Sequence, residues 1–547
     1  MPASDGLKSQ RPLAACLALL WEDYSFLLAQ KFPTLCLHDE FIFFPRLTAA
    51  WDHWFTVAQL EETALTAASG QLAELLGRLE SFKPKTPKPE SAAEAVLFKQ
   101  SLESVLRELG PGGPWEWDPF LYLKVAALAW APVLAQAPHL DWQNQEKVAE
   151  LLFQTGRLFT WGTKRLRALT QPGKLLSPGA LADGRRFFKE VVPDFLTAHF
   201  PLRTALLALL KDLWRNLERF CEAVATLPAT AAFARGGEGL AAILTQSWGW
   251  PGDLKRAAAI LREELKESRE ALVQAAKEIK PRRSWQTIFK DFQLPSQALD
   301  LLALYRQEVA NLWDFWQQAG VLPPFKGRVV VAETPLYLRT LRSSASYAAP
   351  WGPPETSPGG FYLNPETEDL GHHLRHYRFL SAHETVPGHH FLDTLRLSLA
   401  SPVTRQYESP LFYEGWACYA ETLLLSEGYL SAPHDRLVGW QRRLWRGLRG
   451  QVDLNLQTGS FSLEDALKYL RQAGYPEATT RIQVLHLALN PGYQLCYTLG
   501  LREVLALKDR FAPALGLARF HEALLSGGQL PFNLVEQRLG EGPGSFL

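Results

Sequence analysis

One eight-residue segment, from His383 to His390, constrains the fold of this chain more than any other part of its sequence. It reads His-Glu-Thr-Val-Pro-Gly-His-His. A helix that binds zinc through His-Glu-x-x-His has its second His four residues after the first. Here that position is Pro387, which has no metal-binding atom, and the next His comes two residues later. The segment can therefore bind a metal only if its helix is distorted.

Regular helical geometry separates the histidines of this segment. At about 100° per residue, His389 would lie about 120° around the helix from His383, and His390 would lie about 10.5 Å along the axis. Zinc requires nitrogen ligands at about 2.0–2.1 Å, so neither pair could share an ion. Pro387 removes a helical hydrogen bond to the carbonyl group of His383, and Gly388 can adopt backbone angles closed to other residues. A local bulge at these two residues would make His389, and not His390, the second ligand.

The alternative is that these histidines are packed or solvated side chains that bind nothing. A single His-Glu pair is a weak signal. However, six of the 13 histidines fall in one short window, at positions 372, 373, 376, 383, 389 and 390. This clustering favours metal binding, with Glu384 beside the metal.

A downstream carboxylate offers a third ligand. Residues 413–421 read Tyr-Glu-Gly-Trp-Ala-Cys-Tyr-Ala-Glu, and they predict a helix with Glu414 and Glu421 on one face. A catalytic zinc has three protein ligands and one open position. The aromatic and small neighbours of Glu414 indicate burial, and a buried carboxylate needs a charged partner or a metal. The alternative is an amphipathic helix with solvated glutamates.

These motifs resemble those of known families. The segment from Glu414 to Ala417 is similar to the Glu-Gly-Phe-Ala of the aminopeptidase branch of the gluzincin metallopeptidases, in which a separate glutamate helix supplies the third zinc ligand. More closely, the chain resembles the bacterial domain-of-unknown-function family 885, which carries His-Glu-x-x-Pro-Gly-His-His and Glu-Gly-Trp-Ala-x-Tyr-Ala-Glu. Looser matches are Pro491, Gly492, Tyr497 and Gly500, together with Ser462, Glu464 and Ala466. The resemblance covers most of the chain and is sharp from about residue 325 onward.

The chain departs from the pattern of this family at three places. Gln457 stands where the family often has the His of Gly-Leu-His, and His486 stands in place of the Arg of an Arg-Tyr pair. Tyr493 follows the Pro-Gly where the family has Gln. These changes leave the metal ligands intact, but they allow altered specificity or weakened activity.

The resemblance implies a mainly α fold, with a large helical shell around a deep cleft and a small β element beside the zinc. It also implies a zinc-dependent hydrolase that cleaves the peptide (amide) bonds of short peptides. One Zn²⁺ ion would be held by His383, His389 and Glu414, with Glu384 as general base.

Other residues receive roles through the same resemblance. Tyr497 is the candidate donor to the oxyanion, with Tyr493 second. His390 and Glu421 would contact substrate or orient the ligands. Two alternatives remain: a metal-dependent amidohydrolase with a non-peptide substrate, and a non-catalytic descendant that binds metal or peptide.

Helical periodicity dominates the chain outside one segment. Helices are predicted at residues 59–81, 92–109, 255–279 and 301–318, and the two motifs lie on helices near 370–400 and 411–427. Short strands are predicted at 328–332, 346–348 and 360–364. Their edge could pair with an extended substrate, although a small structural hairpin is the alternative. We expect a helical N-terminal region, 1–325, that forms part of the cleft wall, and a catalytic region, 326–547, in one continuous structural unit.

Composition limits the possible partners. The formal net charge is zero, and no basic stripe indicates a nucleic acid. The arginines at 442, 443, 446 and 449 lie on one helix face, which could instead bind a substrate carboxylate. Nothing in the sequence predicts the oligomeric state.

The sequence also bears on location. The five cysteines are scattered and odd in number, which favours a reducing compartment. No apolar run reaches the ~18 residues of a membrane span. The apolar stretch from Leu13 to Trp21 ends at Glu22 without a small-residue cleavage site, and no lipobox-like Cys stands in a suitable setting. We therefore expect a cytoplasmic protein, with export as the alternative.

Overall fold

The contacts of the chain divide it into two compact units. The computed structural model describes residues 13–82, 88–135, 144–200, 204–230, 235–291, 300–339, 342, 344–350, 358–364 and 370–540. The first unit comprises Met1–Phe233 and Ala400–Tyr407, and the second comprises Ala234–Leu399 and Glu408–Leu547. This division lies elsewhere than the boundary at 325/326 suggested by the sequence. Two long helices before residue 325 pack against later helices, Leu254–Ile279 against Pro433–Gln457 and Leu301–Ala319 against Leu370–Glu384.

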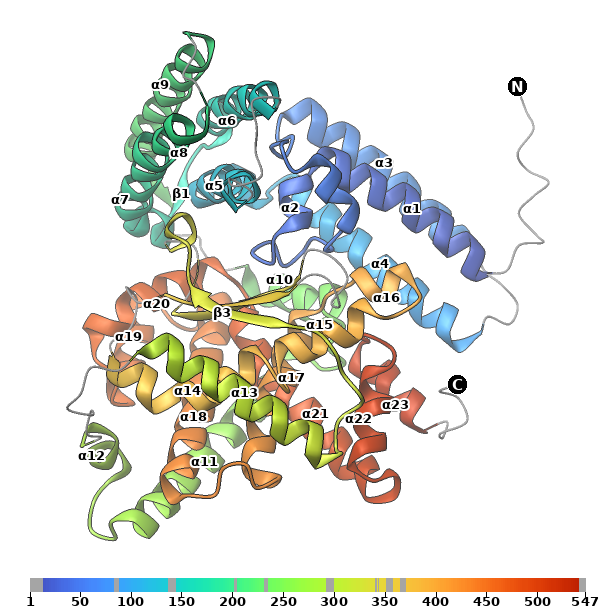
Figure 1. Ribbon diagram of the computed structural model, residues 1–547, viewed down its shortest axis with the longest axis vertical. Coiled ribbons are helices and arrows are strands. Elements are labelled where there is room, and N and C mark those ends of the chain that lie inside the picture. The colour runs from blue at the N-terminus through green and yellow to red at the C-terminus, as the bar shows by residue number, and fades with distance from the viewer. Residues whose placement is uncertain are drawn as a thin grey trace. The chain divides into compact units, whose positions relative to one another are not determined.

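The first unit is almost entirely helical (Figure 1). Its segment 400–407 lies between the two sequence motifs, and it is tied to the unit by a hydrogen bond from Trp21 Nε1 to Gln406 Oε1 at 2.7 Å. The described elements are α1 (Leu13–Lys31), α2 (Pro33–Leu37), α3 (Glu62–Ser81), α4 (Pro89–Leu109), α5 (Pro119–Ala135), α6 (Gln145–Arg165), β1 (Leu169–Thr170), α7 (Gln171–Arg186), α8 (Val192–His199), α9 (Thr204–Thr226), β2 (Ala229–Thr230) and α16 (Pro402–Gln406).

The second unit carries both sequence motifs, and the predicted mainly α fold is confirmed in it as in the first unit. Its described elements are α10 (Gly236–Ala242), α11 (Leu254–Ile279), α12 (Trp285–Lys290), α13 (Leu301–Ala319), β3 (Val329–Glu333), β4 (Ala345–Ala348), β5 (Gly359–Leu363), α14 (Leu370–Glu384), α15 (His389–Leu397), α17 (Pro410–Ser426), α18 (Pro433–Gln457), α19 (Leu463–Gln472), α20 (Glu477–Leu489), α21 (Tyr493–Leu515), α22 (Leu517–Leu525) and α23 (Phe532–Gly540).

The three strands predicted before the histidine motif form one small sheet. Its order is β3-β5-β4, with β3 parallel and β4 antiparallel to β5. Alternate strand residues are buried, as expected for a half-buried sheet. Val331 and Phe361 pack with Tyr305 of α13 and Leu380 of α14. The sheet therefore lies against the helix that carries the first histidine, with β4 at one edge.

Helix α1 has the length and composition of a membrane-crossing helix. Its apolar window has a mean hydropathy of 1.2, and 39% of that window is buried within the fold. The pair Pro89–Glu116 and Pro119–Ala135 passes the same test together, although it is bent by 110°. A core helix and an N-terminal signal sequence share these properties, so the absence of a membrane span stays a prediction.

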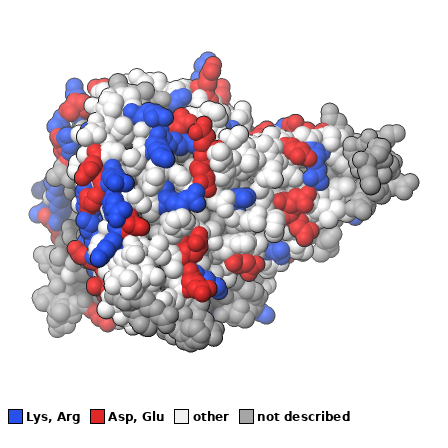
Figure 2. Space-filling view, turned by 90° about the horizontal axis from the view of Figure 1, so that it is seen from above, with Lys and Arg blue, Asp and Glu red and all other residues white. Residues whose placement is uncertain are grey.

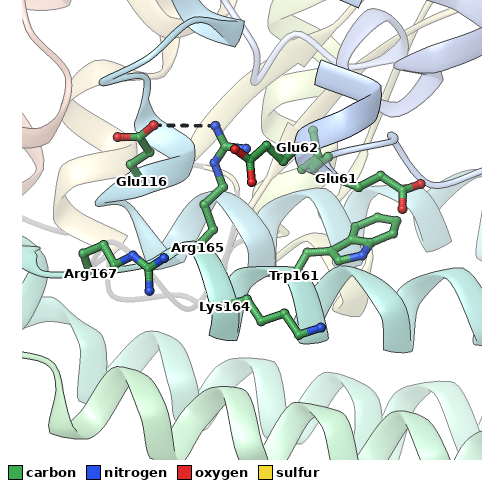
Figure 3. A pocket seen from close by; sticks show the side chains of 8 residues that line it. Glu61, Glu62, Glu116, Trp161, Lys164, Arg165 and Arg167 are labelled. Carbon is green, nitrogen blue, oxygen red and sulfur yellow. Dashed lines mark ion pairs between the residues drawn. The ribbon is translucent and has the colours of Figure 1, made fainter. Parts of the chain in front are cut away.

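The first unit contains a polar pocket with a volume of about 350 Å³. Arg165 points towards Glu116, and their charged groups are 3.6 Å apart (Figure 3). The pocket is lined by Leu60, Glu61, Glu62, Glu116, Trp161, Lys164, Arg165 and Arg167. Acidic and basic side chains are also interspersed on the molecular face shown in Figure 2.

Candidate metal centre

The break between α14 and α15 brings His383 and His389 together. Helix α14 ends at Glu384, and α15 begins at His389. Across the break, the Gly388 N–H donates to the carbonyl oxygen of Ala382 at 2.9 Å, six residues back rather than four. A Cβ atom on Gly388 would lie 1.9 Å from the carbonyl oxygen of His383, so only glycine fits. The expected distortion is present, as an interruption of the helix rather than a bulge within it.

His383, His389 and Glu414 form one buried group. Each of the three residues is 5% exposed, and one ligand atom from each lies within 4.8 Å of the other two. Glu414 Oε2 is 3.4 Å from His383 Nε2 and 3.7 Å from His389 Nε2. Within the described part of the chain, Glu414 Oε2 accepts no hydrogen bond. This group could hold a metal ion.

The spacing of these atoms fits an ion of the size of zinc. Two ligands at about 2.0–2.1 Å from a tetrahedral ion lie about 3.3–3.4 Å from each other. The observed separations from Glu414 Oε2 are close to this value. A buried carboxylate oxygen without a donor is costly, and a metal would provide its missing partner. His390 is not part of the group.

A carboxylate and two arginines orient His383. The His383 Nδ1–H donates to Glu421 Oε1 at 3.0 Å, which directs Nε2 towards the metal position. Arg442 and Arg446 each bind both oxygens of Glu421. Burial raises the pKa of the Glu421 carboxyl, but the two arginines outweigh burial and hold this pKa well below its ordinary value.

The acidity of His383 reflects the same surroundings. Burial opposes the charged imidazole, but the nearby carboxylates of Glu414 and Glu421 outweigh burial and raise the pKa of His383 to about 9. Metal ligation requires the neutral imidazole, so an ion bound here would displace this proton.

Glu414 is held by α21 as well as by its own helix, α17. Its Oε1 accepts a hydrogen bond from the Tyr493 hydroxyl at 2.6 Å. The two helices cross closely at Gly415 and Gly500. A Cβ atom on Gly415 would lie 2.5 Å from Gly500 backbone atoms. Trp416 Nε1 donates to the Pro387 carbonyl at 2.7 Å, which ties α17 to the break before α15.

Glu384 lies beside the group and faces the edge of the sheet. Its Oε2 accepts a hydrogen bond from the backbone N–H of Tyr347, on β4, at 2.9 Å. Burial raises the pKa of Glu384 to about 7, although the nearby His383 lowers it in part. A carboxyl group with a pKa near neutrality can both accept and return a proton.

Three aromatic side chains surround the ligands. The ring of Tyr413 stacks on that of His389, with centroids 4.0 Å apart and an interplanar angle of 14°. The ring of Tyr497 lies 6.5 Å from that of His383 at 19°. Tyr493 donates to Glu414, as described above, and its ring contacts Tyr497 edge-on.

His390, expected to contact substrate, lies away from the ligand atoms. It is 1% exposed, and its Nδ1 is 3.4 Å from the Tyr347 hydroxyl. Burial lowers the pKa of His390 to about 4, so this imidazole is neutral. A substrate contact by His390 stays a prediction.

The departures from the family pattern have different surroundings. Gln457 is fully buried, and its amide donates to the Ala488 carbonyl and accepts from the Arg235 N–H, both at 3.2 Å. His486 is exposed on α20. Tyr493 alone contacts a ligand, so it is the departure that bears directly on the metal group.

Sequence reasoning missed Asp453. This buried carboxylate accepts the backbone N–H groups of Gly492 and Gln494 at 3.0 Å, at the first turn of α21. Burial outweighs these bonds and raises the pKa of Asp453 to about 7. Asp453 fixes the start of the helix that carries Tyr493 and Tyr497. No motif spacing indicates this role, since the partners are distant in sequence.

Comparison with known proteins places the chain in a family. The family described as "Bacterial protein of unknown function (DUF885)" matches residues 55–539. The chain belongs to this family. No curated protein matches the chain. The expected relationship to the gluzincins is not shown by these matches and stays a prediction.

Two solved structures have the same fold as this DUF885 chain. "The putative lipoprotein from Colwellia psychrerythraea" aligns with a TM-score of 0.74 at 16% identity, covering 97% of this chain and 99% of that one. "A putative lipoprotein of unknown function from Shewanella oneidensis" aligns with a TM-score of 0.73 at 17% identity, covering 96% and 99%.

These matches contradict the expected cytoplasmic location, because both are described as lipoproteins. The cysteine argument behind that expectation was wrong for a physical reason. All five cysteines are free, and four of them are buried. Burial protects a thiol from oxidation and pairing, so the lack of pairs says little about the compartment.

Proposed function

We propose that this chain is a zinc-dependent hydrolase that cleaves peptide (amide) bonds of short peptides. The observation that carries the proposal is the pair of imidazole nitrogens facing Glu414 Oε2, a buried oxygen with no hydrogen-bond donor in the described chain. Two histidines, one glutamate and a second carboxylate beside them, outside the ligand set, are the residues of a hydrolytic zinc site.

The residues around the metal position have complementary roles. Zinc bound by His383, His389 and Glu414 would supply a Lewis acid that activates water and polarises the substrate carbonyl. Glu384 takes a proton as the water oxygen attacks the carbonyl carbon. It returns this proton to the nitrogen as the C–N bond breaks, which yields a carboxylate and an amine. The Tyr497 hydroxyl would donate to the oxyanion, a role supported by the position of its ring 6.5 Å from that of His383.

The edge strand β4 is the proposed binding surface for an extended substrate. The outward-facing N–H of Tyr347 points at Glu384, so this edge and the proposed base lie together. Main-chain pairing at a strand edge positions peptides of varied sequence.

Metal analysis tests the ligand set. We expect about one zinc per chain in the wild type, retention of the zinc in Glu384→Ala, and its loss in Glu414→Ala. Glu427→Ala is the matched control, since Glu427 caps the C-terminal end of α17, the helix that carries Glu414, and lies outside the ligand group. Full retention of zinc after Glu414→Ala would overturn the assignment.

Turnover separates the proposal from its alternatives. We expect the metal-loaded wild type to cleave members of a short-peptide pool, and Glu384→Ala to keep the metal and lose this activity. Turnover confined to non-peptide amides would indicate an amidohydrolase. A metal-loaded protein without turnover of either class would indicate a binding protein.

We also propose that the protein is exported. The two solved structures with this fold are described as lipoproteins, and α1 has the apolar character of a signal or anchor segment. Fractionation of cells expressing the tagged full-length chain tests this, with a cytoplasmic enzyme as marker. Co-fractionation with that marker alone would contradict it.

A further inference from the structure

Three of the four arginines on one face of α18 bind carboxylates within the fold. Arg442 and Arg446 bind Glu421, and Arg443 binds Glu264, with N···O distances of 2.6 to 2.9 Å. Both carboxylates are buried, so the guanidinium groups of these three arginines are engaged in ion pairs within the fold. They are not available to bind a substrate.

Arg449, the fourth arginine, has no such partner. Within the described residues it forms no ion pair, and its buried Nε has no hydrogen-bond partner. Its guanidinium carbon instead lies 5.6 Å from the Trp445 ring centroid and 5.2 Å from that of Tyr497. The side chain as a whole is only half-buried. A desolvated guanidinium without an anion is costly, so this position favours an anion from outside the chain.

Tyr497 connects Arg449 to the metal group. The ring that contacts the guanidinium also stacks against His383. An extended peptide advances about 3.3–3.6 Å per residue. The distance from the cleaved bond to a carboxylate one or two residues beyond it is therefore comparable with the two ring contacts, 5.2 Å from Arg449 to Tyr497 and 6.5 Å from Tyr497 to His383.

We propose that Arg449 binds the C-terminal carboxylate of the substrate, so that the site releases one or two residues from the free C-terminus of short peptides. This inference rests on the proposed hydrolase function. A planar guanidinium pairs with a carboxylate through two parallel hydrogen bonds, and the aromatic rings of Trp445 and Tyr497 hold it in place. A neutral C-terminal amide would leave the guanidinium unpaired.

Two peptide pools test the proposal, one with free C-terminal carboxylates and the same pool amidated. We expect kcat/KM of the wild type to be about 10- to 100-fold higher on the free acids. Arg449→Gln should reduce turnover of the acids to about that of the amides, mainly through KM, with a much smaller loss on the amides. Arg449→Lys should keep part of the preference for free acids, because lysine retains the positive charge but cannot form the two parallel hydrogen bonds of a guanidinium.

The matched control is Arg436→Gln, on the same helix but paired with Glu278 at the surface. It should keep the acid preference of the wild type. Zinc content and thermal unfolding, measured for every variant, separate a lost contact from a lost fold. Equal turnover of acids and amides by the wild type would overturn the proposal. An equal loss on both pools in folded, metal-loaded Arg449→Gln would also overturn it.

Binding measurements distinguish failure of this proposal from failure of the hydrolase proposal. Titration of Glu384→Gln with N-acyl dipeptides, followed by tryptophan fluorescence, requires no turnover. Tighter binding of the acid than of its amide, lost in Glu384→Gln/Arg449→Gln, supports the carboxylate site even if no peptide is cleaved. Peptide cleavage without any preference in binding rejects the carboxylate site alone.

Discussion

The two carboxylate oxygens of Glu414 have different neighbours. Oε1 accepts the hydroxyl proton of Tyr493, whereas Oε2 faces the two imidazoles. Loss of a partner that orients a metal ligand typically costs about 10- to 100-fold in metal affinity. Tyr493 is also a departure from the family pattern, so this chain holds its glutamate in a way that the motif does not predict.

Tyr493→Phe should weaken metal binding without abolishing it. The change removes the hydrogen bond to Glu414 Oε1 and keeps the ring, so we expect about a 10- to 100-fold loss of zinc affinity. Competition with a chromogenic chelator measures this. An unchanged affinity would mean that Glu414 needs no orientation by Tyr493.

Tyr497→Phe provides the contrast within the same helix. The Tyr497 hydroxyl donates no hydrogen bond within the described residues, so its removal should leave zinc affinity unchanged. If it donates to the oxyanion, kcat should fall by about 10²–10³-fold. A loss of zinc from this variant would instead assign Tyr497 a structural role.

At the scale of elements, the crossing of α17 and α21 positions the glutamate ligand. Gly415 and Gly500 allow the two backbones to approach, since a Cβ atom on Gly500 would lie 2.1 Å from the Leu411 carbonyl oxygen. The crossing brings Glu414 and Tyr493 within hydrogen-bond distance. The close approach of the two backbones therefore explains why both positions are glycine.

Gly500→Ala should lower both stability and zinc affinity. The added methyl group meets backbone rather than a flexible side chain, so we expect a loss of about 1–3 kcal/mol or more in the free energy of unfolding. Urea unfolding measures this loss. Gly77→Ala, on an exposed part of α3 with nothing within 4 Å of the added atom, is the control. It should stabilise the protein by about 0.5–1 kcal/mol. A similar gain in Gly500→Ala would disprove the close crossing.

Local elements were predictable where a local cause exists. The strands and the helices that carry the motifs lie within a few residues of their predicted bounds, because periodicity and flanking Pro and Gly residues specify them. The break before His389 follows from Pro387 and Gly388. The division into units was not predictable, because it depends on which long helices pack together.

At the scale of the whole molecule, His521 joins distant parts of the second unit. Its Nδ1 lies 2.6 Å from the Val321 carbonyl oxygen, and its Nε2 lies 2.8 Å from the Tyr419 hydroxyl. Burial lowers the pKa of His521 to about 4, although the bond to Val321 opposes the shift. The fold therefore requires the neutral imidazole.

Protonation of His521 should lower the free energy of unfolding in mild acid. An unfolded histidine has a pKa of about 6.5, so the stabilising effect of neutral His521 is complete above this pH. As the pH falls towards 4, this effect is lost, because the unfolded chain takes up the proton before the folded chain does. The resulting loss in the free energy of unfolding is on the order of 3 kcal/mol. Urea unfolding at pH 7.5 and pH 5 should show a smaller pH dependence in His521→Gln than in the wild type. His434→Gln, exposed on α18, should keep the dependence of the wild type. Equal dependence in all three proteins would contradict the role of His521.

The sequence by itself determined the residues that could bind a metal and the place where the helix must break. Both follow from local chemistry, since proline lacks an N–H and glycine can adopt backbone angles closed to other residues. Only the tertiary structure decided which arginines are paired with carboxylates. It pairs Arg442, Arg443 and Arg446 with buried glutamates and leaves Arg449 beside Tyr497. Helix periodicity places all four arginines on one face, but their partners come from other helices, and helical spacing carries no information about them.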